Sequence, residues 1–201
     1  MGGCIMSGNI RLYNTSGYVE LQAPSSASAQ VLELPTDSIK PALVHLHTEN
    51  FSAVSSVSVD DVFSSEYENY RLILDTTSTA NVEWSLRLRV SGADNSTANS
   101  YVTQKLTASA STVSGSRTTH DNWSFGEHQN VQGNGHDAII WRPFAAEKTS
   151  FWNNTAATAS NAYLSIRTGT HNQATSYDGF TIYQASGTFS GTLRIYGYRN
   201  S

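Results

Sequence analysis

The chain has 201 residues and a net charge of −4, and Ser, Thr and Asn together account for 65 of the residues. Only three of the 12 basic residues are lysines. The clustered basic surface that neutralises a phosphate backbone is therefore missing, and we expect no nucleic-acid partner. The hydrophobic share of 38% is too high for a disordered chain. No apolar run approaches the roughly 20 residues of a membrane span, so we expect no membrane partner.

Residue preferences predict an all-β fold. Thr, Val and Tyr favour strands, Asn and Ser favour turns, and all of these are common here, while strong helix formers are scarce. The single cysteine, Cys4, excludes an intrachain disulfide and a cysteine-based zinc site. The first residues lack the charged and apolar pattern of a secretory signal, so we expect assembly in a cytoplasm.

Residues 1–41 are predicted to form an arm of short strands. Ile10–Tyr13 and Tyr18–Gln22 are strand-like and are joined by turn-forming residues, which predicts a hairpin. Val31–Pro35 is predicted to be a third short strand. The arm has too little apolar mass to bury a core alone. We therefore expect it to anchor the protein and to form trimer contacts through its apolar residues, which are Ile10, Leu12, Tyr18, Val19, Leu21, Leu32 and Leu34.

Residues 42–201 are predicted to form a jelly-roll-like β-sandwich. The clearest strand is Val82–Val90, in which apolar and polar residues alternate over the whole length, so that one face is predicted to be buried. Loops rich in Asn, Ser and Gly are predicted at 91–99, 109–116, 126–135 and 169–176, and no segment predicts a helix. The other predicted strands are 44–47, 57–59, 70–74, 101–106, 119–125, 138–144, 149–153, 162–168, 180–185 and 192–198.

Two groups of histidines were considered as metal ligands. His45 and His47 are two residues apart on one predicted strand, so they are expected to share a face. The pairs His120–Asp121, Glu127–His128 and His136–Asp137 lie within a loop-rich stretch, and loops can gather such residues around zinc or calcium. A polar sheet face and solvated loops explain the same residues, so we predict no metal site.

No motif predicts catalysis. The chain has no nucleophile elbow, no zinc-protease motif and no phosphate-binding glycine loop. The dense acidic patches, Asp60–Asp61 and Glu66 with Glu68, lie in a predicted loop, where neighbouring acids are commonly just solvated. We therefore predict a protein that is not an enzyme and needs no cofactor.

Three tryptophans in the second half of the chain are candidates for contact with a glycan or a protein partner. Trp123, Trp141 and Trp152 lie in sequence rich in Asn, Asp and Gln, and exposed aromatic rings beside such side chains are suited to sugars. The same rings can fill the core of a sandwich, where aromatic residues bury large areas, and the core is the favoured position for each ring taken singly.

Several segments resemble virion-surface structural proteins of tailed bacteriophages, of the capsid-decoration and tail-fibre type. In the arm these are Ile10–Asn14, Gly17–Pro24 and Leu34–Pro35. In the sandwich they are Tyr70–Leu72, Tyr177–Phe180 and Gly191–Tyr198. The resemblance implies a homotrimer without catalytic activity, located on the virion surface.

Two functions are compatible with these features. In the first, the protein is a capsid decoration (cement) protein or head fibre, whose arm binds the major capsid protein. In the second, it is a tail fibre or receptor-binding head, which is bound to a tail component and contacts a host-surface glycan. Only about forty residues precede the predicted sandwich, whereas a tail fibre normally carries an anchoring module and a shaft. The sequence therefore favours decoration.

Overall fold

The computed structural model describes residues 10–14, 17–21, 42–128, 133–157 and 163–200, in two compact units, Met1–Ile39 and Lys40–Ser201. In the first unit, β1 (Ile10–Asn14) and β2 (Gly17–Leu21) pair antiparallel, with Ile10 opposite Leu21, so the predicted hairpin is confirmed. The structure describes the backbone of the anchor candidates, which are Ile10, Leu12, Tyr18, Val19 and Leu21. Leu32, Leu34 and the predicted strand Val31–Pro35 lie outside the described residues.

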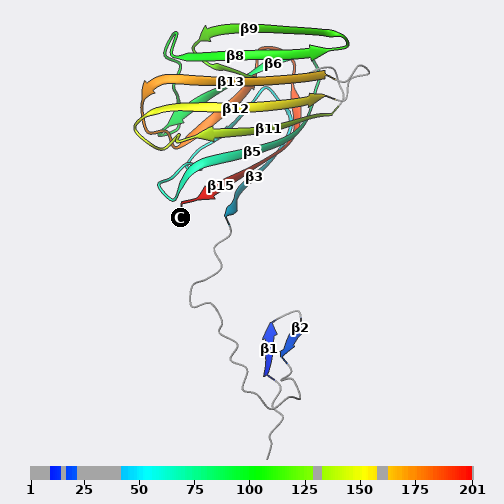
Figure 1. Ribbon diagram of the computed structural model, residues 1–201, viewed down its shortest axis with the longest axis vertical. Helices are drawn as coiled ribbons and strands as arrows, with labels where there is room; N and C mark the ends of the chain where they lie inside the picture. Colours follow the sequence, from blue (N-terminus) through cyan, green and yellow to red (C-terminus); the bar gives the residue numbers. More distant parts are fainter. Residues whose placement is uncertain (1–9, 15–16, 22–41, 129–132, 158–162, 201) are drawn as a thin grey trace, which may run out of the picture. The chain divides into compact units, whose positions relative to one another are not determined.

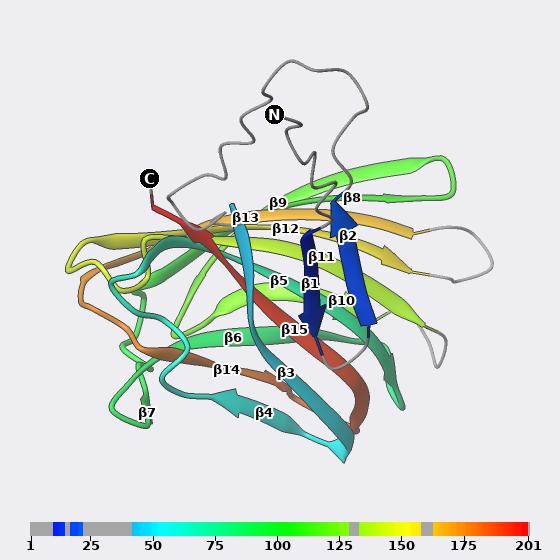
Figure 2. The same ribbon diagram turned by 90° about the horizontal axis from the view of Figure 1, so that it is seen from below.

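The second unit consists of strands in two antiparallel sheets (Figures 1 and 2). The larger sheet has the order β3-β15-β5-β11-β12-β13-β8-β9, and the smaller has the order β10-β6-β14-β4, with β7 paired to β6. The strands are β3 (Leu43–Val54), β4 (Ser56–Val59), β5 (Tyr67–Ser78), β6 (Val82–Val90), β7 (Ala93–Asp94), β8 (Tyr101–Ser109), β9 (Thr112–His120), β10 (Trp123–His128), β11 (Asn134–Trp141), β12 (Lys148–Ala157), β13 (Tyr163–Ala174), β14 (Gly179–Gln184) and β15 (Phe189–Arg199).

The all-β prediction is confirmed, and the two layers are compatible with a β-sandwich. The described residues contain no helix, and thus none long and apolar enough to cross a membrane. The finer prediction of a jelly roll is not confirmed. The larger sheet has eight strands and the smaller sheet has five, so the two sheets are not of equal size. The larger sheet curls over the smaller one, as Figure 2 shows.

The core lies between the two sheets and follows from strand parity. On β6, Trp84, Leu86 and Leu88 are each at most 1% exposed, which confirms the predicted buried face. They belong to one apolar cluster with inward residues of the larger sheet, such as Leu72 and Ile140. Successive side chains on a strand alternate between faces, so the polar neighbours of these residues point away from the core.

Some predicted strand boundaries are wrong. Strands were predicted from the alternation of apolar and polar residues, and a strand that is polar on both faces lacks this alternation. The predicted loop 109–116 is mostly strand: β8 and β9 form a long hairpin, and β9 is exposed along nearly its whole length. The predicted loop 169–176 is strand as far as Ala174. The predicted strand 119–125 is broken at Asp121–Asn122, where the chain passes from the larger sheet to the smaller one.

A polar cluster around a buried arginine joins the two sheets. Arg167 on β13 is 0% exposed, and its Nη2 donates to Glu127 on β10 (2.8 Å) and to Glu83 on β6 (3.3 Å). Burial alone would raise the pKa of Glu83, but hydrogen bonding from Lys105 and the charge of Arg167 outweigh it and lower that pKa. Burial and the hydrogen bond to Glu127 raise the pKa of Tyr163, so its hydroxyl stays protonated and donates to Glu127.

Candidate functional site

The outward face of the larger sheet points away from the smaller sheet and carries the candidate site. On four neighbouring strands, Tyr196, Arg71, Ile139 and Trp152 lie directly opposite one another in register. We call these four residues the central row. They come from β15, β5, β11 and β12, so segments far apart in the sequence form one continuous surface.

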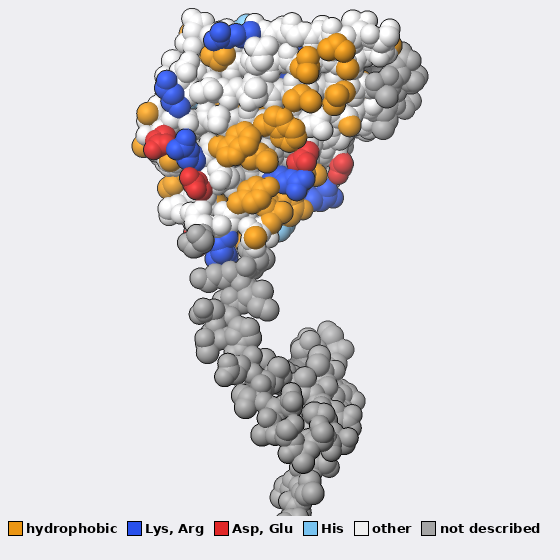
Figure 3. Space-filling view, viewed as in Figure 1, with side chains coloured by type: hydrophobic (Ala, Val, Ile, Leu, Met, Phe, Trp, Pro, Cys, Tyr) orange, Lys and Arg blue, Asp and Glu red, His pale blue; other side chains and the backbone are white. Residues whose placement is uncertain are grey.

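Further aromatic side chains extend this surface. Trp141 and Tyr198 stand two residues along from Ile139 and Tyr196, and therefore on the same face. Both are half-buried, as are the members of the central row. Figure 3 shows hydrophobic side chains gathered across the middle of this face, with opposite charges among them. The apolar surface is thus partly sheltered by its own packing and partly open to a ligand.

An ion pair lies within the apolar surface. Arg71 donates from Nε to Asp137 Oδ1 (2.8 Å) and from Nη2 to Asp137 Oδ2 (2.7 Å), a bidentate geometry that fixes both side chains. The hydrogen bond to Asp137 raises the pKa of the Arg71 guanidinium, so Arg71 stays protonated. The face therefore presents fixed polar groups as well as aromatic rings.

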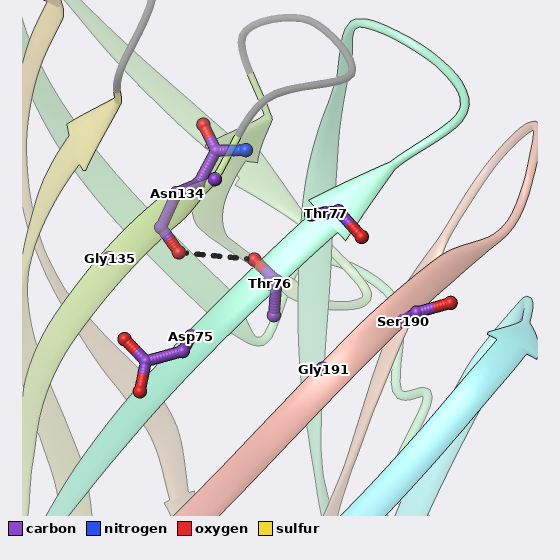
Figure 4. A pocket seen from close by; sticks show the side chains of 8 residues that line it. Asp75, Thr76, Thr77, Asn134, Gly135, Ser190 and Gly191 are labelled. Carbon is purple, nitrogen blue, oxygen red and sulfur yellow. Dashed lines mark hydrogen bonds between the residues drawn. The ribbon is translucent and has the colours of Figure 1, made fainter.

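Two adjoining hollows open beside the central row. One, of about 240 Å³, lies over β5, β11 and β12 and is lined by Asp137, Asn154 and Ala156 among others. The second, of about 500 Å³, shares Asp75 and Gly135 with the first and reaches β15. Figure 4 shows the second hollow, with the Asp75 carboxylate extending beside the backbone of Gly135.

Small residues create the hollows. Gly135 and Ala156 lie opposite each other in register, at outward positions of β11 and β12. A Cβ atom added at Gly135 would have its nearest neighbour, the Ala156 carbonyl oxygen, 4.0 Å away. A larger side chain would therefore fit there without disturbing the backbone, and glycine leaves the space open.

The charges around the hollows cancel. Asp137 is paired with Arg71, and Asp75 accepts a hydrogen bond from Arg194 Nη1 (3.1 Å). Both carboxylates keep further acceptor positions, because a carboxylate has about four lone-pair sites. The face thus combines flat apolar rings, hydrogen-bond acceptors and an amide without an excess of either charge, which is suited to binding a neutral polar molecule.

The three candidate tryptophans lie in two different environments. Trp141 and Trp152 lie on the outward face, as a surface contact requires. Trp123 is 0% exposed and packs in the core, with its ring centroid 4.7 Å from that of Phe151. The expectation that Trp123 contacts a ligand is therefore wrong for this structure, because the inward face of β10 buries its ring between the sheets.

The histidine groups are not brought together. A bulge between His45 and His47 places His45 opposite Tyr196 and His47 opposite Ile195, so the expectation that they share a face is wrong. His136 points into the core, 4.6 Å from the ring of Trp84, whereas Asp137 points outward. Among the described residues, no three His, Cys, Asp or Glu side chains are grouped as a metal site requires.

Sequence reasoning missed most of the polar part of the site. Asp137 entered only as half of the metal-ligand pair His136–Asp137, and Arg71 and Asp75 were not singled out, although the alternation of Tyr70–Leu74 already places Arg71 on the outward face. The position of Gly135 beside Asp75 depends on the pairing of β11 with β5, which are 60 residues apart. Pairing over such a distance leaves no local signal in one sequence.

Comparisons with family models, with curated proteins and with solved structures return no match to this chain. The binding chemistry of the outward face therefore has to be inferred from its own residues.

Proposed function

We propose that the protein is a non-enzymatic structural protein on the surface of a tailed-bacteriophage particle. In this proposal, trimers decorate the capsid and act as a cement, and the N-terminal arm binds the major capsid protein. The proposal rests on the segments that resemble phage virion-surface proteins and on the organisation of the chain.

The observation that carries the proposal is the hairpin in a unit of its own. Residues Met1–Ile39 and Lys40–Ser201 are separate compact units, and β1 and β2 are only five residues long each. A two-stranded hairpin of this size is marginally stable alone, so docking on a partner stabilises it. Three arms on one trimer would bind a shell together, because the second and third engage at high effective concentration.

A receptor-binding role is the second candidate. The outward face of the larger sheet favours it, because half-buried aromatic rings surround a fixed ion pair and open hollows. In this role the protein is the head of a tail fibre and contacts a glycan on the host surface.

Particles that lack the protein distinguish the two roles. For a cement, we expect depleted particles to open at lower temperature and still adsorb to cells, because a protein that binds only the assembled shell stabilises it by mass action. Adding the full chain should restore the opening temperature, whereas a chain without residues 1–39 should not bind.

Two outcomes contradict the proposal. Depleted particles with unchanged thermal stability and lost adsorption would favour the receptor-binding role. Normal occupancy of the chain without residues 1–39 would exclude the arm as the anchor.

A further inference from the structure

We propose that the outward face of the larger sheet binds a neutral saccharide, with one face of a sugar ring on Trp152 and its hydroxyls directed into the hollows beside Gly135. The inference rests on the receptor-binding role, the second candidate function, for its biological meaning. The binding itself is a property of the purified protein.

The aromatic rings supply the apolar half of the site. A pyranose ring has a face of C–H groups, which packs on an aromatic face much as another apolar group does. Trp152 and Ile139 are cross-strand partners, and the first hollow begins next to them at Asp137 and Asn154. A ring stacked on Trp152 therefore has its edge at the hollow.

The polar half of the site surrounds that hollow. Asp137 is held by the two hydrogen bonds from Arg71, and its remaining lone pairs can accept from ligand hydroxyls. The Asn154 amide can both donate and accept, and Asp75 supplies a second carboxylate across Gly135. Vicinal hydroxyls of a sugar match such closely spaced acceptors.

The charge balance favours a neutral ligand. Each carboxylate of the hollows already has an arginine partner, Arg71 for Asp137 and Arg194 for Asp75. A cationic ligand would have to displace these arginines, and an anionic ligand would meet the carboxylates directly. The larger hollow, about 500 Å³, lies within the range of roughly 300–1,000 Å³ that is typical of small-molecule sites.

The same charges argue against a second copy of the chain as the occupant. Acidic residues are depleted at the cores of protein–protein interfaces, yet Asp137 lies within this surface and Asp75 lines the adjoining hollow. Burying the Arg71–Asp137 pair under a flat protein surface would remove both groups from water at a cost. A sugar leaves water at its edges and offers hydroxyls to the carboxylate.

The experiment titrates the purified full chain with saccharides and measures binding by calorimetry and saturation-transfer NMR. The probes are glucose, galactose, mannose and N-acetylglucosamine, their α- and β-linked oligomers of two to four units, lactose, and sialyllactose as an anionic comparison. We expect at least one neutral oligomer to bind, and sialyllactose to bind more weakly than lactose, which is its neutral core.

Two variants test the position of the site. Trp152→Ala removes the stacking surface and Gly135→Gln fills the hollow, and each is expected to weaken binding by about tenfold or more. Val113→Ala is the matched control, because Val113 is an apolar residue, 68% exposed, on the edge strand β9, four strands from β11. It should leave the affinity unchanged, and thermal unfolding should show that all three variants fold.

Three results would overturn the proposal: no neutral probe binds, binding is equal in Trp152→Ala, Gly135→Gln and the unchanged chain, or the chain self-associates through this face and Trp152→Ala abolishes the association. Each of these results is measured on purified protein, whereas the capsid role is tested on particles. Failure of saccharide binding can therefore be distinguished from failure of the capsid role.

Discussion

His171 on β13 is a histidine enclosed by aromatic rings. Its side chain is 0% exposed, its ring centroid lies 4.0 Å from that of Tyr101, and its Nε2 lies 2.6 Å from the Tyr177 hydroxyl oxygen. Burial in this setting lowers the pKa of His171 to about 4. The folded state therefore holds the neutral imidazole, whereas the unfolded chain takes up a proton near pH 6.5.

Stability should consequently fall with acidification. Between about pH 6.5 and pH 4 the unfolded chain binds more protons than the folded chain, so the free energy of unfolding decreases as pH falls through this window. The decrease attributable to His171 is about 2 kcal/mol between pH 7 and pH 4.5. Urea unfolding of the unchanged chain and of His171→Gln at pH 7 and pH 4.5 gives the loss of unfolding free energy for each protein. The difference between the two losses is the contribution of His171.

The control for this experiment is His120→Gln, which removes an exposed histidine on β9. It should retain the acid-dependent loss of the unchanged chain, whereas His171→Gln should show a loss smaller by about 2 kcal/mol. Equal losses in the unchanged chain and His171→Gln would show that His171 is not held neutral by the core.

At the scale of the elements, β13 is joined to the smaller sheet through Arg167. This guanidinium is the cation between Glu83 on β6 and Glu127 on β10, and its Nε also donates to Ser165 (3.1 Å). We expect Arg167→Ala to lower the free energy of unfolding by about 3–5 kcal/mol, because it leaves the Glu127 carboxylate, whose side chain is 17% exposed, without its cation, while Glu83 keeps Lys105. Denaturant unfolding at pH 7 measures the change.

An exposed ion pair gives the matched comparison. Arg194 and Asp75 face outward with side chains 40% and 70% exposed, so Arg194→Ala should cost less than about 1 kcal/mol. Arg167→Ala with Glu127→Gln should be less destabilising than Arg167→Ala alone, because the second change removes one uncompensated charge. If Arg167→Ala costs no more than Arg194→Ala, the buried cluster does not hold the sheets together.

Individual strands could be predicted where one face packs on the core. Val82–Val90 was predicted with its correct bounds, because Trp84, Leu86 and Leu88 alternate with polar residues and all three are buried. The first part of β9, residues 112–116, falls in a predicted loop, because this strand lies at the sheet edge and buries almost nothing. The bulge beside His47 was also missed, since cross-strand register leaves no mark in a single sequence.

At the scale of the whole molecule, the fold class could be predicted from composition, but the site could be predicted only in part. Trp141 and Trp152 were proposed as surface residues and lie on the outward face, while Trp123 carries the same local signal and lies in the core. The two cases differ in which face of each strand packs between the sheets. The pairing of β11 with β5 brings Gly135 beside Asp75.

The division of the chain into two units leads to a prediction about its assembly. The arm contributes two five-residue strands, which make a marginal hairpin by themselves, whereas the second unit has its own apolar core. We therefore expect the arms of three copies to associate. Light scattering at micromolar concentration should give about 65 kDa for the full chain, three times the chain mass of 21.8 kDa.

A chain that begins at Lys40 is the test of where the trimer contacts lie. It should have the mass of one copy and unfold at the same temperature as the second unit of the full chain, since the described core lies wholly within Lys40–Ser201. A full chain that stays at 21.8 kDa would exclude the trimer under these conditions. A shortened chain that remains trimeric would move the contacts from the arm to the sandwich, and the outward face would then have to be examined as an interface between copies.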